Sequence, residues 1–254
     1  MNTFLDFYQT IGPQLSVLVF VTFLLAGAVK GVIGLGLPTV AMGLLGLAML
    51  PTQAAALLII PSTVTNVWQL AAGGHLRGLL VRLWPMLVMV FVGTCAGSLL
   101  VGMSGEHWMT RALGGALTLY AISGLFLPTF RVPASAERWL GPLCGLVTGL
   151  ITSATGVFVI PAVPYLQALG MARDELVQAL GLSFMVSTLA LAAGLLWNGA
   201  LAGGEFSASL LALAPALLGM ALGQWLRHRI SAAMFKRAFF IGMGALGLHL
   251  LTMG

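Results

Sequence analysis

The chain has 254 residues, of which 59% are hydrophobic and only 7% are charged, and its mean hydropathy is +1.05. A soluble domain carries about 25% charged residues, so this composition excludes a soluble enzyme or a soluble binding module. The formal net charge of +5 comes from basic residues scattered over short loops, which indicates membrane orientation and argues against nucleic-acid binding.

Apolar segments divide the chain into two halves of similar layout, residues 1–128 and 139–254, joined by a polar cytoplasmic linker at 129–138. Each half has an apolar piece, a glycine-rich break, a second short apolar piece and three spans of about 20 residues. The expected segments are Leu15–Ala28, Thr39–Leu50, Thr52–Ala72, Leu83–Met103 and Ala112–Leu127, then Leu140–Ile151, Val157–Leu169, Leu176–Trp197, Phe206–Leu226 and Ala238–Met253.

The two breaks are the most unusual stretches of the sequence. The first is GAVKGVIGLGLP at Gly27–Pro38, and the second is GLVTGLITSATGVFVIP at Gly145–Pro161. Glycine and proline weaken a helix, so each stretch is expected to break its membrane segment into a hairpin. Matching positions of the breaks in the two halves predict an internal duplication, which is common in secondary transporters.

Residue matches outside the breaks agree with a duplication. The offsets are 118, 121 and 130 residues, and they drift because loops differ in length. The matched pairs are Gly27 and Gly31 with Gly145 and Gly149, Ser62 and Asn66 with Ser183 and Ser187, and Pro85 and Gly93 with Pro215 and Gly223. The motifs Gly93-x3-Gly97 and Gly219-x3-Gly223 predict close helix packing.

Basic loop residues discriminate between two membrane layouts. If each break forms a hairpin without a net crossing, nine basic residues lie on one side and only Arg111 lies on the other. If each break crosses once, the same residues divide six against four. The positive-inside rule favours the first layout, which makes the halves inverted repeats with both termini periplasmic. The nine residues are Arg77, Arg82, Arg131, Arg138, Arg173, Arg227, Arg229, Lys236 and Arg237.

The predicted fold is therefore an all-α polytopic membrane protein with two inverted repeats, each a broken helical hairpin followed by three transmembrane helices. Hairpin tips entering from opposite faces would approach each other near the membrane midplane. A tip exposes backbone N–H groups, and the short helix after it adds a partial positive charge at its N-terminus. Together the two tips predict an anion site.

Twelve residues are candidates for substrate binding at this site. Lys30 lies at membrane depth with no acidic neighbour in sequence, although a lysine can also extend its charge to the interface. Hydroxyl and amide side chains supply further donors, but they often bond to their own helix or to a neighbouring one. The candidates are Lys30, Gly31, Gly34, Gly36, Ser62, Asn66, Thr152, Ser153, Thr155, Gly156, Ser183 and Ser187.

Other chemistries lack the residues that they need. No P-loop is present, the histidines have no metal-ligand spacing, and no cofactor or metal is expected. All six acidic residues fall in loops or at segment ends, so no buried carboxylate is available for a proton relay. Ser153 has no histidine partner in sight, which argues against an intramembrane enzyme. Cys95 and Cys144 are expected to be packing residues.

The two breaks, GAVKGVIGLGLP and GLVTGLITSATGVFVIP, resemble the duplicated glycine-rich motif of the TauE/SafE family of sulfite exporters and anion permeases. The resemblance covers about Leu15 to Leu251. It departs where the usual run of glycines is reduced to Gly34 and Gly36 in the first copy and to Gly156 in the second. The resemblance implies a bacterial inner-membrane transporter of sulfite, sulfonates or related organosulfur anions.

The leading interpretation is a secondary transporter that exports a small anion by alternating access. The expected partners are that anion and the lipid bilayer, with a homodimer left open. An importer or exchanger of another small organic anion is the alternative, followed by a membrane subunit without transport or an intramembrane enzyme.

Overall fold

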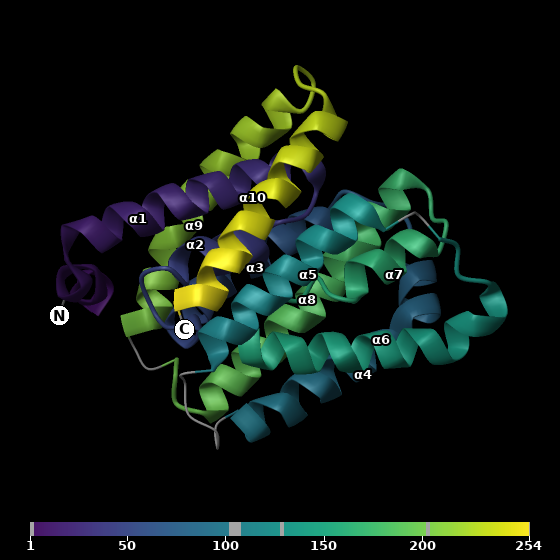
Figure 1. The fold of residues 1–254 in the computed structure, drawn as a ribbon, viewed down its shortest axis with the longest axis horizontal. Coiled ribbons are helices and arrows are strands. Elements are labelled where there is room, and N and C mark those ends of the chain that lie inside the picture. Colours follow the sequence, from purple (N-terminus) through teal and green to yellow (C-terminus); the bar gives the residue numbers. More distant parts are fainter. Residues whose placement is uncertain (1–2, 102–107, 128–129, 202–203, 254) are drawn as a thin grey trace.

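The computed structural model of the chain describes residues 3–101, 108–127, 130–201 and 204–253, which form ten α-helices and no strand (Figure 1). Six of these helices are long and apolar enough to cross a membrane, and they include five of the six expected spans but not Ala112–Leu127. The helices are α1 (Thr3–Ile33), α2 (Leu37–Leu45), α3 (Pro51–Ala71), α4 (Leu76–Val101), α5 (Met109–Phe126), α6 (Ala134–Thr155), α7 (Ala162–Ala168), α8 (Arg173–Trp197), α9 (Gly204–Leu226) and α10 (Ala232–Met253).

The first break is shorter than the sequence suggests. Helix α1 continues through Lys30 to Ile33, so the expected helix end at Ala28 is wrong. Only residues 34–36 separate α1 from α2, and Gly34 and Gly36 have positive φ angles of 78° and 107°. These backbone conformations favour glycine, which explains why the chain turns here and not earlier.

The second break lies close to its predicted place. Helix α6 ends at Thr155, and Gly156 takes a left-handed conformation with φ 66° as its C-cap. The irregular residues that follow lead into the short helix α7. Helix α6 begins at Ala134 rather than at Leu140. It therefore includes residues 134–138, which were expected to belong to the polar linker.

Glycines allow α1 to lie along α9, and α4 to lie along α6 (Figure 1). A Cβ atom at Gly31 would overlap the carbonyl of Met220, and one at Gly149 would overlap the carbonyl of Val90. The predicted packing motifs are confirmed. Cβ atoms at Gly93, Gly219 and Gly223 would overlap main-chain atoms of the facing helix, and one at Gly97 would overlap the side chain of Ser153. Helix backbones can approach closely only where such side chains are absent.

These two contacts correspond to each other between the halves. Gly149 follows Gly31 by 118 residues, and Met220 follows Val90 by 130 residues, which are the offsets seen in the sequence. In the same way, Gly27 meets Ala216 and Gly145 meets Met86.

Helices α3 and α8 cross at the centre of the molecule and run in opposite directions. Ser62 of α3 bonds Thr188 of α8, whereas Gly73, just beyond the C-terminus of α3, accepts a hydrogen bond from Gln178 near the start of α8. Helices α5 and α10 are also antiparallel, since Gly114 lies against Leu250 and Gly124 lies against Phe240. Each of these pairs joins one half of the chain to the other.

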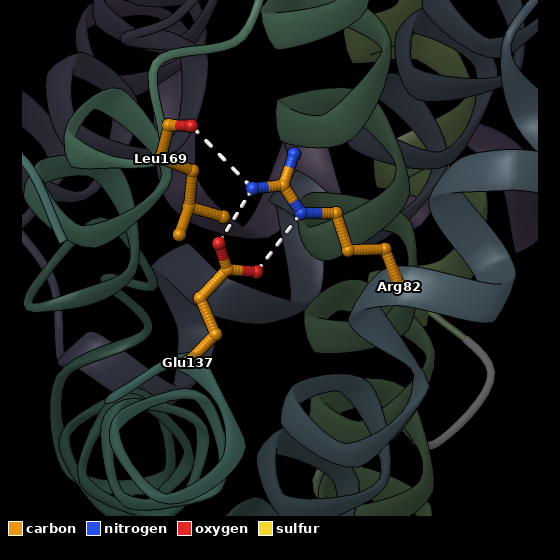
Figure 2. Close-up of polar contacts among 3 residues, drawn as sticks. All are labelled: Arg82, Glu137 and Leu169. Atoms are coloured by element: carbon orange, nitrogen blue, oxygen red, sulfur yellow. Dashed lines mark hydrogen bonds and ion pairs between the residues drawn. The ribbon is translucent and has the colours of Figure 1, made fainter. Parts of the chain in front are cut away.

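An ion pair ties the start of α4 to the start of α6 (Figure 2). The Nε and Nη2 atoms of Arg82 donate to the two carboxylate oxygens of Glu137 at 2.9 and 2.7 Å. Nη2 also lies 3.4 Å from the carbonyl oxygen of Leu169, just after α7. The guanidinium thus connects the second broken segment to α4 at one end of the bundle.

We expect Gly149→Ala to destabilise the protein, because its methyl group would enter the backbone of α4. Overpacking of this kind costs about 1–3 kcal/mol. Gly242→Ala in α10 is the matched control, since nothing lies within 4 Å of a Cβ atom there. Thermal unfolding of detergent-solubilised variants measures the difference. Equal unfolding temperatures for Gly149→Ala and the unaltered protein would contradict this close approach of α6 and α4.

Candidate functional site

A cavity of about 360 Å³ lies among α1, α3, α8 and α9. Lys30 and Gln69, both buried, line its inner part. Arg173, Asp174 and His228, which are exposed, line its outer part together with Arg227, so two arginines outnumber one carboxylate there. The cavity therefore leads from a basic rim at the surface to a buried ammonium group.

Lys30 is held by neutral groups alone. The residue is 3% exposed, and Nζ donates to Thr65 Oγ1 at 2.9 Å and to Asn66 Oδ1. Within the described part of the chain, the ion pair of Arg82 with Glu137 is the only one, so no carboxylate neutralises Lys30 there. An ammonium has three N–H donors, and these two bonds engage two of them. A buried charge of this kind is a strong candidate for an anion-binding group.

A chain of hydrogen bonds extends from Lys30 across α3 to α8. Asn66 Nδ2 donates to Ser62 Oγ at 3.2 Å, and Ser62 Oγ lies 2.9 Å from Thr188 Oγ1. Thr188 gives its own proton to the carbonyl of Phe184, so Ser62 must be the donor to Thr188. Every donor in this network points away from Lys30, and the predicted site residues Ser62 and Asn66 belong to the network but do not line the cavity.

The first break borders the cavity. Gly31 and Gly34 line the cavity, and the carbonyl of Gly34 accepts a 2.6 Å hydrogen bond from Gln69 Nε2. Gly36 lies instead against Val29 and Phe239, at the start of α2, which has no side-chain cap. Of the four candidates in this break, Lys30, Gly31 and Gly34 line the cavity, and Gly36 does not.

The second break is bonded within its own helix. Thr152 and Ser153 donate to the carbonyls of Thr148 and Leu150, and Thr155 donates to Ile151. Local bonding, the alternative that the sequence left open, therefore accounts for these three hydroxyl donors. Gly156 lies against Met42 of α2 rather than at the cavity with Lys30.

The two α8 candidates have a different environment. Ser183 and Ser187 are both fully buried, and neither hydroxyl has a hydrogen-bond partner among the described residues. They lie one turn apart, so they share one face of the helix.

Several site residues were not identified from the sequence. Thr65 bonds Lys30, Gln69 holds the first break, and Thr188 ends the hydrogen-bond chain. Thr65 and Thr188 stand directly beside the candidates Asn66 and Ser187, so polar neighbours in otherwise apolar spans were an available signal. The rim arginines lie at the start of α8 and just after the end of α9, far apart in sequence, and only the fold brings them together.

The comparisons with known proteins give one match. The family model described as "Sulfite exporter TauE/SafE" matches residues 19–250. The comparison with curated proteins and the comparison with solved structures each give no match.

A double-mutant cycle tests whether Asn66 stabilises the Lys30 charge. Asn66→Leu is expected to lower the free energy of unfolding by about 2–3 kcal/mol, because a buried ammonium loses an acceptor. Adding Lys30→Met should restore part of this stability, since no buried charge then needs that acceptor. Thermal unfolding in detergent measures all four proteins. Additive effects of the two substitutions would show that Asn66 does not stabilise the charge.

Proposed function

The chain belongs to the sulfite exporter TauE/SafE family of membrane transporters, and we propose that it moves sulfite or an organosulfonate across the bacterial inner membrane by alternating access. The observation that carries this proposal is the buried ammonium of Lys30 at the inner end of a cavity with a basic rim. The family is one of transporters, so the site is assigned to binding and not to catalysis.

Lys30 is suited to bind an anion because its charge is not neutralised. In a medium of low dielectric constant, an ammonium without a carboxylate partner strongly attracts an incoming anion. Thr65 and Asn66 keep the group in place while leaving one N–H unassigned. Arg173 and Arg227 raise the local concentration of anions at the entrance.

The cavity wall fits a small anion with a short organic part. Trp68 lines the cavity and offers an apolar surface beside the basic groups. A sulfonate has an anionic head and an apolar tail, so it could use both kinds of surface. Sulfite would use the basic groups alone. The same combination of basic and apolar lining residues would also suit another small organic anion, so an importer of such an anion is the alternative function.

The arrangement of the helices supports inverted repeats. Corresponding glycines make corresponding contacts in the two halves, Gly31 with α9 and Gly149 with α4. The equivalent helices α3 and α8 are antiparallel, as are α5 and α10. A two-fold axis that exchanges antiparallel membrane helices must be perpendicular to them, and therefore lies in the membrane plane. Such halves are inverted, as in many secondary transporters.

Under the positive-inside rule, the cavity opens to the cytoplasm and both chain ends lie in the periplasm. Membrane potential then favours export, because one anion leaving a cell with a negative interior gains about 2.3 kcal/mol per 100 mV. No separate ion-coupling carboxylate is needed for that direction.

Flux of radiolabelled sulfite through proteoliposomes tests the role of Lys30. Lys30→Met should lower the rate by about tenfold or more, since it removes a charge-assisted contact worth about 1.5–3 kcal/mol. Asn66→Asp should also lower the rate, because its carboxylate would pair with Lys30. Gln53→Glu is the control for added charge, at an exposed position of α3. An unchanged rate in Lys30→Met would remove Lys30 from the site.

Cysteine labelling tests the orientation. In a background without Cys95 and Cys144, we expect Arg77→Cys and Arg173→Cys to react with an impermeant thiol reagent only from the cytoplasmic side. Arg111→Cys should react only from the periplasm. Periplasmic labelling of both Arg77→Cys and Arg173→Cys would refute the orientation.

A further inference from the structure

Three unpartnered hydroxyls stand in the second half at the positions that correspond to the Lys30 network. The offset of 118 relates Lys30 to Thr148, and the offset of 121 relates Ser62 and Asn66 to Ser183 and Ser187. Thr148, Ser183 and Ser187 are each 0% exposed. All three hydroxyl oxygens lack a hydrogen-bond partner among the described residues, where only six buried side-chain atoms do so.

The contacts of the neighbouring glycines support the correspondence of Lys30 with Thr148. Each residue precedes a glycine that meets the backbone of the parallel helix, Gly31 on α9 and Gly149 on α4. Lys30 contacts α3 through Thr65 and Asn66, and the correspondence of the two halves predicts that Thr148 faces the equivalent helix α8, against which α6 packs. Lys30 bridges its two helices with a long side chain, but the side chain of Thr148 ends at its hydroxyl.

The hydroxyl protons of these three residues are not engaged in hydrogen bonds within the described chain, and this indicates which kind of ligand they would bind. Most helical threonines whose side chains the structure describes donate to a carbonyl one turn earlier, which is the usual arrangement. The examples are Thr63, Thr65, Thr94, Thr118, Thr152, Thr155 and Thr188. A hydroxyl bonded in this way still has lone pairs for a cation. Only a ligand that accepts hydrogen bonds requires the proton to be left free, so the three hydroxyls suit an anion better than a cation.

We propose that Thr148, Ser183 and Ser187 form a second binding station for the transported anion, in the half opposite Lys30. The proposal rests on the proposed function, because it places a second stop on the same route. An oxyanion would accept hydrogen bonds from three neutral O–H groups there. Leaving buried donors unpaired costs stability, and a ligand that visits the site explains why they are kept.

A neutral station suits the release side of an exporter. A second buried ammonium would hold the anion tightly, whereas passage requires each site to bind well enough for entry and weakly enough for departure. In this structure the Lys30 side opens to a cavity and the three hydroxyls are fully buried. The route is thus open on the Lys30 side and closed at the three hydroxyls, so release through the second station would require a different conformation of the two halves.

Sulfite flux and sulfite binding, measured on the same variants of the full chain, test the station. Thr148→Val and Ser187→Ala remove one donor each with little change of shape. Each should lower the maximal flux by about tenfold while the affinity measured from the cytoplasmic side stays unchanged, because Lys30 is intact. Thr148→Ser should keep the flux. Thr94→Val is the control, a buried threonine whose donor is already engaged.

The possible failures are distinguishable. Full flux in Thr148→Val and in the double variant Ser183→Ala/Ser187→Ala, with slow flux in Lys30→Met, would overturn the station and leave the proposed function standing. A sodium dependence of flux that disappears in Thr148→Val would also overturn it, since the hydroxyls would then bind a cation. Should Thr148→Val fail to fold, the serine double variant gives the same readout. Absence of flux in the unaltered protein would overturn the proposed function itself.

Discussion

Lys30 carries an ammonium group into an apolar helical bundle, where an unpaired ion costs several kcal/mol unless hydrogen bonds replace its water. Thr65 and Asn66 supply two of these bonds, and Ser62 and Thr188 hold Asn66 in place. The charge is tolerated only while α1, α3 and α8 keep their positions. Stability and function are therefore joined, because the bundle stabilises the group with neutral partners and leaves its charge for an anion.

Close packing of α1 against α9 positions the ammonium group of Lys30. The glycines of α1 and α9 let two backbones meet, and this contact keeps α1 helical as far as Ile33. The helical path directs Lys30 toward α3, and the turn at Gly34 then brings a backbone carbonyl to Gln69. The same packing recurs between α4 and α6, where Thr148 of α6 takes the place of the lysine. We infer that one architecture supplies a charged station and a neutral one.

Sequence reasoning located the order of segments, both breaks and the members Lys30, Ser62 and Asn66 of the central network, because hydropathy and matched offsets are local properties. It placed the end of α1 too early, since the cost of Gly27 and Gly31 in a helix was judged without the contact with α9 that requires them. Which hydroxyls are free to bind a ligand depends on side-chain torsion angles, which the sequence does not give. Thr152 and Thr155 look like free donors in sequence, yet both bond their own helix.

Binding of selenite, a heavier analogue of sulfite, tests the central claim most directly, because selenium can be located by anomalous scattering in crystals of the full chain. The account predicts an anomalous peak at the inner end of the cavity, within hydrogen-bond distance of Lys30 Nζ, and its loss in Lys30→Met. A peak that persists in Lys30→Met, or one that lies away from Lys30 in the unaltered protein, would contradict the account.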